Sequence, residues 1–307
     1  MTLLAHILLR TSKPNLEDIA KRLLFSASAL HEPIATLQIV SKAFQDGALA
    51  KPELANPLQR LTTLAKIDKN ASAMILLAQI LESQGKIDKA LAYYEQIAND
   101  EGKTYGATAE VQGTVAQAWL ALGRIRTSNE DSTGAEAAWK KAALEYDEPT
   151  AYFYLARFRD PKSDDYLLYN LKAASSGVRE AAHNLGDFYL RQSKQTKFED
   201  SKDVTSGLSG SKDQQPNPSS DLSQISPAKL PQGAHSQEKR KLAREWFNVA
   251  AYAGFAPSQV NLALLLRADG CFDEGLTWLK RAEKHPDFGA EVDRLKESWW
   301  RKDGDLT

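Results

Sequence analysis

Apolar side chains recur every three or four residues along most of this chain, which is the spacing of one face of a helix. Residues 166–191 show the pattern most clearly. The apolar positions there are Leu167, Leu171 and Ala174, followed by Ala182, Leu185 and Tyr189. Gly177 lies between the two runs, and glycine readily takes the left-handed conformation in which helices often end. The stretch therefore predicts two helices joined by a tight turn.

The same helix pair recurs elsewhere in the chain. In each copy an Ala-Ala pair closes one helix, and a leucine followed by Ala or Gly lies in the next helix. The alanine pairs are Ala142-Ala143, Ala173-Ala174 and Ala250-Ala251, and the leucine pairs are Leu155-Ala156, Leu185-Gly186 and Leu262-Ala263. The second alanine recurs after 31 residues from Ala143 to Ala174 and again from Ala251 to Ala282. The interval between Ala174 and Ala251 is 77 residues, which predicts an insertion.

This pattern resembles the Sel1-like repeat, a relative of the tetratricopeptide repeat. Residues 71–99 resemble the tetratricopeptide repeat itself. The matching positions are Leu77-Ala78, Leu81, Gly85, Ala90 and Tyr94. Together the units cover roughly residues 60–285. The resemblance implies an all-α protein, an α-solenoid of stacked antiparallel helix pairs that form a right-handed superhelix.

The composition divides the chain into five regions. They are an N-terminal helical region of divergent repeats or a cap (1–70), tetratricopeptide- and Sel1-like repeats (71–191), a disordered low-complexity insert within a repeat (192–238), continued Sel1-like repeats (239–285), and a C-terminal capping helix and tail (286–307). The insert is rich in Ser, Lys, Gln, Asp and Pro, and it has too little apolar surface to offset the entropy of ordering. Because it interrupts one repeat, we expect helix 181–191 to pack against helix 239–253. We expect Trp299 and Trp300 to cover the end of the core.

Charge and cysteine content suit a soluble intracellular protein. The 307 residues carry a net charge of −1, so no overall field favours nucleic acid or an anionic membrane. Cys271 is the only cysteine and cannot form a disulfide within the chain, which fits a reducing compartment. No apolar run approaches the ~20 residues that span a bilayer. We expect a cytoplasmic protein, and the pattern does not predict its oligomeric state.

The N-terminal apolar run offers one alternative location. Leu3 to Leu9 is short and no basic segment precedes it, so it is a poor secretory signal and is typical of a first helix. Basic residues follow at Arg10 and Lys13, as in a mitochondrial presequence, but Glu17 and Asp18 interrupt the acid-free pattern. A mitochondrial location therefore stays open.

The residues for catalysis, metal binding or phosphate binding are not arranged in known motifs. The five histidines are scattered, with no HxxxH or CxxC pair, and no GxSxG is present. The run GLSGSK from Gly207 lacks the spacing of a phosphate loop. We therefore expect no enzyme activity, no cofactor and no metal. The basic run Lys239-Arg240-Lys241 is brief, so RNA binding is only a second alternative.

The resemblance also implies a function, because Sel1-like proteins are adaptors and assembly scaffolds. It implies that a protein or peptide binds in the concave groove, which the first helix of each pair lines. By analogy with the tetratricopeptide motif, the contact residues are Gln79, Glu82, Phe153, Arg157, His183, Asp187, Arg191, Val260, Leu264 and Arg267. The first alternative is a mitochondrial factor for assembly or export of respiratory-complex (cytochrome oxidase) subunits. Within the insert, Ser226-Pro227 is a candidate site of regulatory phosphorylation.

Overall fold

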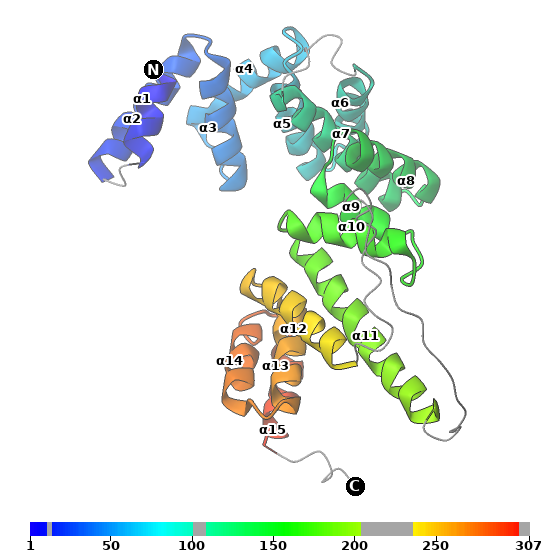
Figure 1. Cartoon of the computed structure of the whole chain (residues 1–307). Helices are drawn as coiled ribbons and strands as arrows, with labels where there is room; N and C mark the ends of the chain where they lie inside the picture. Colours follow the sequence, from blue (N-terminus) through cyan, green and yellow to red (C-terminus); the bar gives the residue numbers. More distant parts are fainter. Residues whose placement is uncertain (11–13, 101–108, 204–235, 301–307) are drawn as a thin grey trace, which may run out of the picture. The chain divides into compact units, whose positions relative to one another are not determined.

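The computed structural model describes residues 1–10, 14–100, 109–203 and 236–300. Over these ranges the chain is all-α, with no strand. It forms two compact units, unit 1 (Met1–Ala151) and unit 2 (Tyr152–Thr307) (Figure 1). Helix α9 (Pro149–Ala156) spans the boundary between them.

Unit 1 is a series of helices joined by short turns. They are α1 (Thr2–Arg10), α2 (Pro14–Ala29), α3 (Pro33–Gln45), a 3-10 turn (Pro52–Leu54), α4 (Ala55–Lys66), α5 (Ala71–Ser83), α6 (Ile87–Asp100), α7 (Ala109–Ser128) and α8 (Ser132–Lys140), which continues as a π-helical turn (Lys141–Glu145). Each helix packs on the next, and α5 also packs on both α3 and α7. Contact of each helix with its neighbour, and of α2 with α4, α3 with α5 and α5 with α7, is the packing of stacked antiparallel pairs, as predicted.

Capping residues set the helix ends in unit 1. The side chain of Asn70 accepts a hydrogen bond from the amide of Ala73 at 2.9 Å, which caps α5. Gly85 ends α5 with a φ of +73°, in the left-handed region. In the turn after α4, Lys69, the residue before Asn70, also has a positive φ, of 52°. The turn between α4 and α5 thus places a lysine in a conformation that favours glycine or asparagine.

Unit 2 continues the same arrangement after α9. It contains α10 (Asp164–Ser175), α11 (Arg179–Asp203), α12 (Ser236–Tyr252), α13 (Ala256–Ala268), α14 (Phe272–Ala282) and α15 (Gly289–Glu297). From α10 to α15 each helix packs on the next. Gly177, between α10 and α11, has a φ of +94°, so the glycine-terminated turn predicted there is confirmed.

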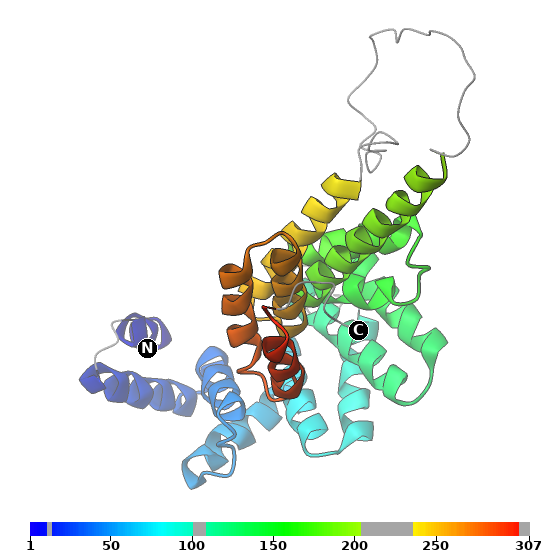
Figure 2. The same ribbon diagram turned by 90° about the horizontal axis from the view of Figure 1, so that it is seen from below.

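Helices α11 and α12 pack closely, although residues 204–235 separate them in the sequence (Figure 2). The predicted packing of helix 181–191 on helix 239–253 is therefore confirmed. The predicted helix end at Arg191 is wrong, because α11 extends to Asp203 and α12 begins at Ser236. Between Gly186 and Gly207 the sequence has no glycine or proline, and its Lys, Gln and Glu residues favour a helix. The rest of the predicted insert lies outside the described residues.

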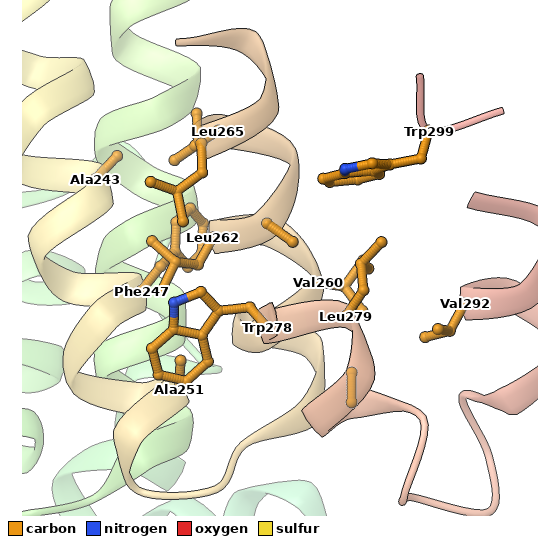
Figure 3. Close-up of a cluster of buried hydrophobic side chains, with 13 residues drawn as sticks. Ala243, Phe247, Ala251, Val260, Leu262, Leu265, Trp278, Leu279, Val292 and Trp299 are labelled. Carbon is orange, nitrogen blue, oxygen red and sulfur yellow. The ribbon is translucent and has the colours of Figure 1, made fainter. Parts of the chain in front are cut away.

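Three aromatic side chains, Phe247, Trp278 and Trp299, are buried in the largely aliphatic core of unit 2. Phe247, Leu262 and Trp278 point toward one another from α12, α13 and α14 (Figure 3). Trp299, after α15, is 1% exposed and covers the end of this core, as predicted. Trp300 does not: it is 62% exposed and stacks on Phe272 at 5.7 Å between ring centroids.

Candidate functional site

The ten residues predicted to contact a partner divide between the two units. Gln79 and Glu82 belong to α5 of unit 1, and the other eight belong to unit 2. Gln79 is exposed. Glu82 is half-buried: it pairs with the guanidinium of Arg124 on α7 and accepts a hydrogen bond from the hydroxyl of Tyr94 on α6 at 3.1 Å. Glu82 therefore ties three helices together.

The hydrogen bond between Tyr94 and Glu82 lies in a buried environment. The side chain is 1% exposed. Burial first, and then the charge of Glu82, raise the pKa of Tyr94, while Arg124 acts in the opposite direction. The phenol therefore stays protonated and keeps donating to Glu82.

In unit 2, hydrogen bonds join α11 and α13, the first helices of two successive pairs. His183 Nδ1 lies 2.8 Å from Ser258 Oγ, and Asn261 Nδ2 donates to Asp187 Oδ1 at 3.3 Å. From the first bond to the second, the contacts advance one turn along both helices in the same direction. The two helices therefore run parallel, as the first helices of stacked pairs do.

One turn beyond Asp187 and Asn261 lie two exposed side chains. Arg191 is on α11, 3.9 Å from Asp187, and its side chain is 72% exposed. Leu264 is on α13 and is 37% exposed. Because α11 and α13 are parallel, the cation and the leucine lie at the same level. We call the surface formed by His183, Asp187, Arg191, Asn261 and Leu264 the α11–α13 face.

His183 anchors this face in an uncharged form. Its ring lies between Phe247 at 5.5 Å and Phe255 at 5.2 Å between centroids. Burial lowers the pKa of His183 below its ordinary value of 6.5, and the nearby carboxylate of Asp187 partly opposes that shift. The histidine is thus a half-buried hydrogen-bonding partner that offers a bound segment little exposed surface.

Two predicted contact residues belong to the packing of unit 2. Val260 is 5% exposed in the core, so its assignment as a partner contact is wrong. Arg267 Nε donates to the backbone oxygen of Trp299 at 2.9 Å, and its guanidinium lies 5.6 Å from the Trp299 ring centroid. Arg267 therefore secures the C-terminal tryptophan.

The remaining predicted contact residues, Phe153 and Arg157, are not part of the α11–α13 face as defined above. Phe153, on α9, is half-buried with its ring 5.4 Å from that of Tyr154, and Arg157 is exposed just after α9. Ser226 lies outside the described residues. Sequence reasoning missed Asn261, whose only signal was its helical spacing of three residues from Ser258.

The described ranges contain neither a candidate metal site nor a helix that could cross a membrane. Within them, no group of three or more His, Cys, Asp or Glu side chains is placed to hold a metal ion. None of the helices described is both long enough and apolar enough to cross a membrane.

Comparisons with known proteins find solved structures that resemble the chain. No protein-family model matches the chain, and no curated protein sequence matches it either. A solved Sel1 repeat protein from Oxalobacter formigenes is 17% identical, with 96% of this chain and 85% of that chain covered and a TM-score of 0.37. The fold described above rests on the contacts within this chain and not on this likeness.

Proposed function

We propose that this chain is a non-enzymatic interaction scaffold that binds a segment of another protein across the α11–α13 face. The observation that supports the proposal is the Asp187–Asn261 hydrogen bond, which sets exposed Arg191 level with exposed Leu264. A cation beside an apolar side chain, on helices fixed by side-chain bonds, suits a partner segment with one acidic and one apolar group.

Cross-linking in cells tests this proposal. A photoreactive amino acid replaces Leu264, and the matched control replaces Lys280, which is exposed on α14 of the same unit. We expect a protein cross-link from position 264 and none of the same mass from position 280. Adding Arg191→Glu should weaken the cross-link about tenfold, because a salt-bridging cation becomes an anion.

A charge-matched variant separates a local effect from a general one. Arg294→Glu makes the same change from a positive to a negative charge, but on α15, which contributes no residue to the α11–α13 face. It should leave the cross-link intact. Equal cross-links from positions 264 and 280, or no effect of Arg191→Glu, would contradict the proposal.

The identity of the cross-linked molecule distinguishes a general protein scaffold from the two alternative functions, mitochondrial assembly and RNA binding. A respiratory-complex subunit or its membrane insertion machinery would favour the mitochondrial assembly alternative. RNA as the species cross-linked from position 264 would favour the RNA-binding alternative instead. Ser226 phosphorylation enters as a modulator: a Ser226→Glu variant should change the cross-link if the residue regulates docking.

A further inference from the structure

Unit 1 contains a cavity with an apolar base between three helices. It has a volume of about 620 Å³ and lies among α4, α5 and α6. Leu77 and Leu81, one turn apart on α5, line it together with Tyr93 of α6. All three side chains are half-buried, so each keeps apolar surface toward the cavity. A volume of this size accommodates several side chains of a bound segment.

Three lysines surround that apolar base. Lys66 ends α4, Lys69 lies in the turn after it, and Lys89 is on the first turn of α6. All three are exposed. The other described side chains that line the cavity are uncharged, so every charge that the described residues bring to it is positive.

Some lysines in the described ranges have an acidic partner, whereas these three, like exposed Lys51 and Lys280, have none there. Lys42 pairs with Asp46 at 2.9 Å, and Lys140 pairs with Glu136 at 3.1 Å. Over the ranges that the structure covers, no carboxylate pairs with Lys66, Lys69 or Lys89. Three like charges around one cavity repel one another, and an anionic ligand would relieve that repulsion.

Lys69 also lies in a strained backbone conformation. Its φ of 52° is in the left-handed region, where five other turns use glycine and three use His31, Glu130 or Asp147. Those glycines are Gly47, Gly85, Gly177, Gly254 and Gly270. A lysine in this conformation makes the fold less stable than glycine or asparagine would. Its side chain adds a third positive charge to the rim of the cavity.

We propose that this lysine-rimmed cavity binds an acidic segment of a separate protein. Carboxylates of the segment reach Lys66, Lys69 and Lys89, and an apolar side chain enters against Leu77 and Leu81. The apolar base favours a peptide over a phosphate ion, which would leave that surface uncovered. The described lining holds no arginine and a single aromatic ring, that of Tyr93, whereas RNA grooves stack successive bases on several rings, so the lysines favour carboxylates over RNA. The site is in unit 1, so it adds to the proposed function in unit 2.

Fluorescence polarisation on the purified full chain tests the proposal. The probe is a labelled synthetic peptide in which glutamates alternate with leucines, and its control has glutamine at every glutamate. We expect the acidic peptide to bind and the glutamine peptide not to bind. The affinity should fall as salt is raised, because the lysines are exposed and screened.

Substitutions locate the binding. Lys66→Glu combined with Lys89→Glu should weaken binding at least about tenfold, because two attractions become repulsions. The charge-matched control is Lys42→Glu with Lys51→Glu, which are exposed lysines outside the cavity and should leave binding unchanged. Lys69→Asn should weaken binding about two- to fivefold while the thermal midpoint stays the same or rises, which excludes unfolding as the cause.

Several results would overturn the proposal. They are no binding of the acidic peptide, equal binding of the glutamine peptide, and binding that the Lys66/Lys89 variant retains. Competition by inorganic phosphate or by oligouridylate at lower concentration than the acidic peptide would assign the cavity to phosphate or RNA instead. Arg191→Glu should not change peptide binding, so this test is independent of the α11–α13 face.

Discussion

The ring of Phe247 on α12 occupies the space that a side chain at position 186 of α11 would need. A Cβ built on Gly186 would lie 2.5 Å from Cδ1 of Phe247 and 2.6 Å from Cε1. Phe247 is fully buried, with 0% exposure. The close approach of α11 and α12 therefore depends on the absence of a side chain at Gly186.

Gly186→Ala should destabilise unit 2. Alanine favours a helix over glycine by about 1 kcal/mol, but overpacking against a buried ring costs about 1–3 kcal/mol. The matched control is Gly113→Ala in α7, where a Cβ meets no atom within 4 Å. Chemical denaturation should show a loss of stability for Gly186→Ala and a gain for Gly113→Ala. Stabilisation by both substitutions would contradict the packing.

His183 should make stability depend on pH. Its folded pKa is lowered by burial, whereas the unfolded histidine keeps the ordinary value of 6.5. The unfolded state therefore binds the proton more readily. The free energy of unfolding should be greatest above pH 6.5 and should fall as pH falls through the folded pKa. Asp187 limits the effect, since it favours the charged ring.

A variant isolates the contribution of His183 to that slope. His183→Asn cannot titrate, and its amide can still reach Ser258 from near the position of Nδ1. The variant should lose stability overall but show a flatter dependence between pH 7 and pH 5. The free energy of unfolding is measured by denaturation at each pH. If its slope against pH is the same in the variant, other groups cause the pH dependence.

The two adjacent tryptophans at the end of α15 should differ greatly in their effect. Trp299 is 1% exposed, and its Nε1 donates to the backbone oxygen of Phe272 at 3.1 Å. Trp299→Ala should cost about 3–5 kcal/mol, as for other buried aromatic side chains. Trp300→Ala, at a 62% exposed position, should cost less than about 1 kcal/mol. Similar losses in thermal denaturation would mean that α15 does not cover the core.

Relief of backbone strain at Lys69 should stabilise unit 1. A residue other than glycine, asparagine or aspartate pays about 1–2 kcal/mol in the left-handed region. Lys69→Asn should therefore raise the free energy of unfolding by about 0.5–1 kcal/mol. Asn at Lys66, whose backbone is helical, is the control and should not stabilise. A loss of stability for Lys69→Asn would show that the lysine side chain itself holds the turn.

Helix positions could be predicted because local signals mark them. The alanine spacing places α10 and α12, and Gly177 ends its helix in the left-handed conformation that glycine permits. The end of α11 could not be predicted in this way. Low apolar content indicated disorder after Arg191, but the helix continues to Asp203, over a stretch whose Lys, Gln and Glu residues favour a helix.

The candidate surfaces were harder to predict than the helices. Helix α13 is apolar on nearly every side, so spacing alone did not show that Val260 is buried while Leu264 is exposed. The sequence around Glu82 did not predict its ion pair with Arg124, because that pair depends on the packing of α5 against α7. The lysine-rimmed cavity has no sequence signature, since Lys66 and Lys89 meet only through the positions of α4 and α6 beside α5.

The pairing of α11 with α12 has a consequence for synthesis of the chain on the ribosome. The 32 residues 204–235 must be translated between these helices. At about 5–20 residues per second, this delays α12 by roughly two to six seconds after α11 is made. During that time the surface of α11 around Leu185 and Gly186 has no partner from its own pair. Nascent chains paused in this interval should therefore be the ones that chaperones bind most readily.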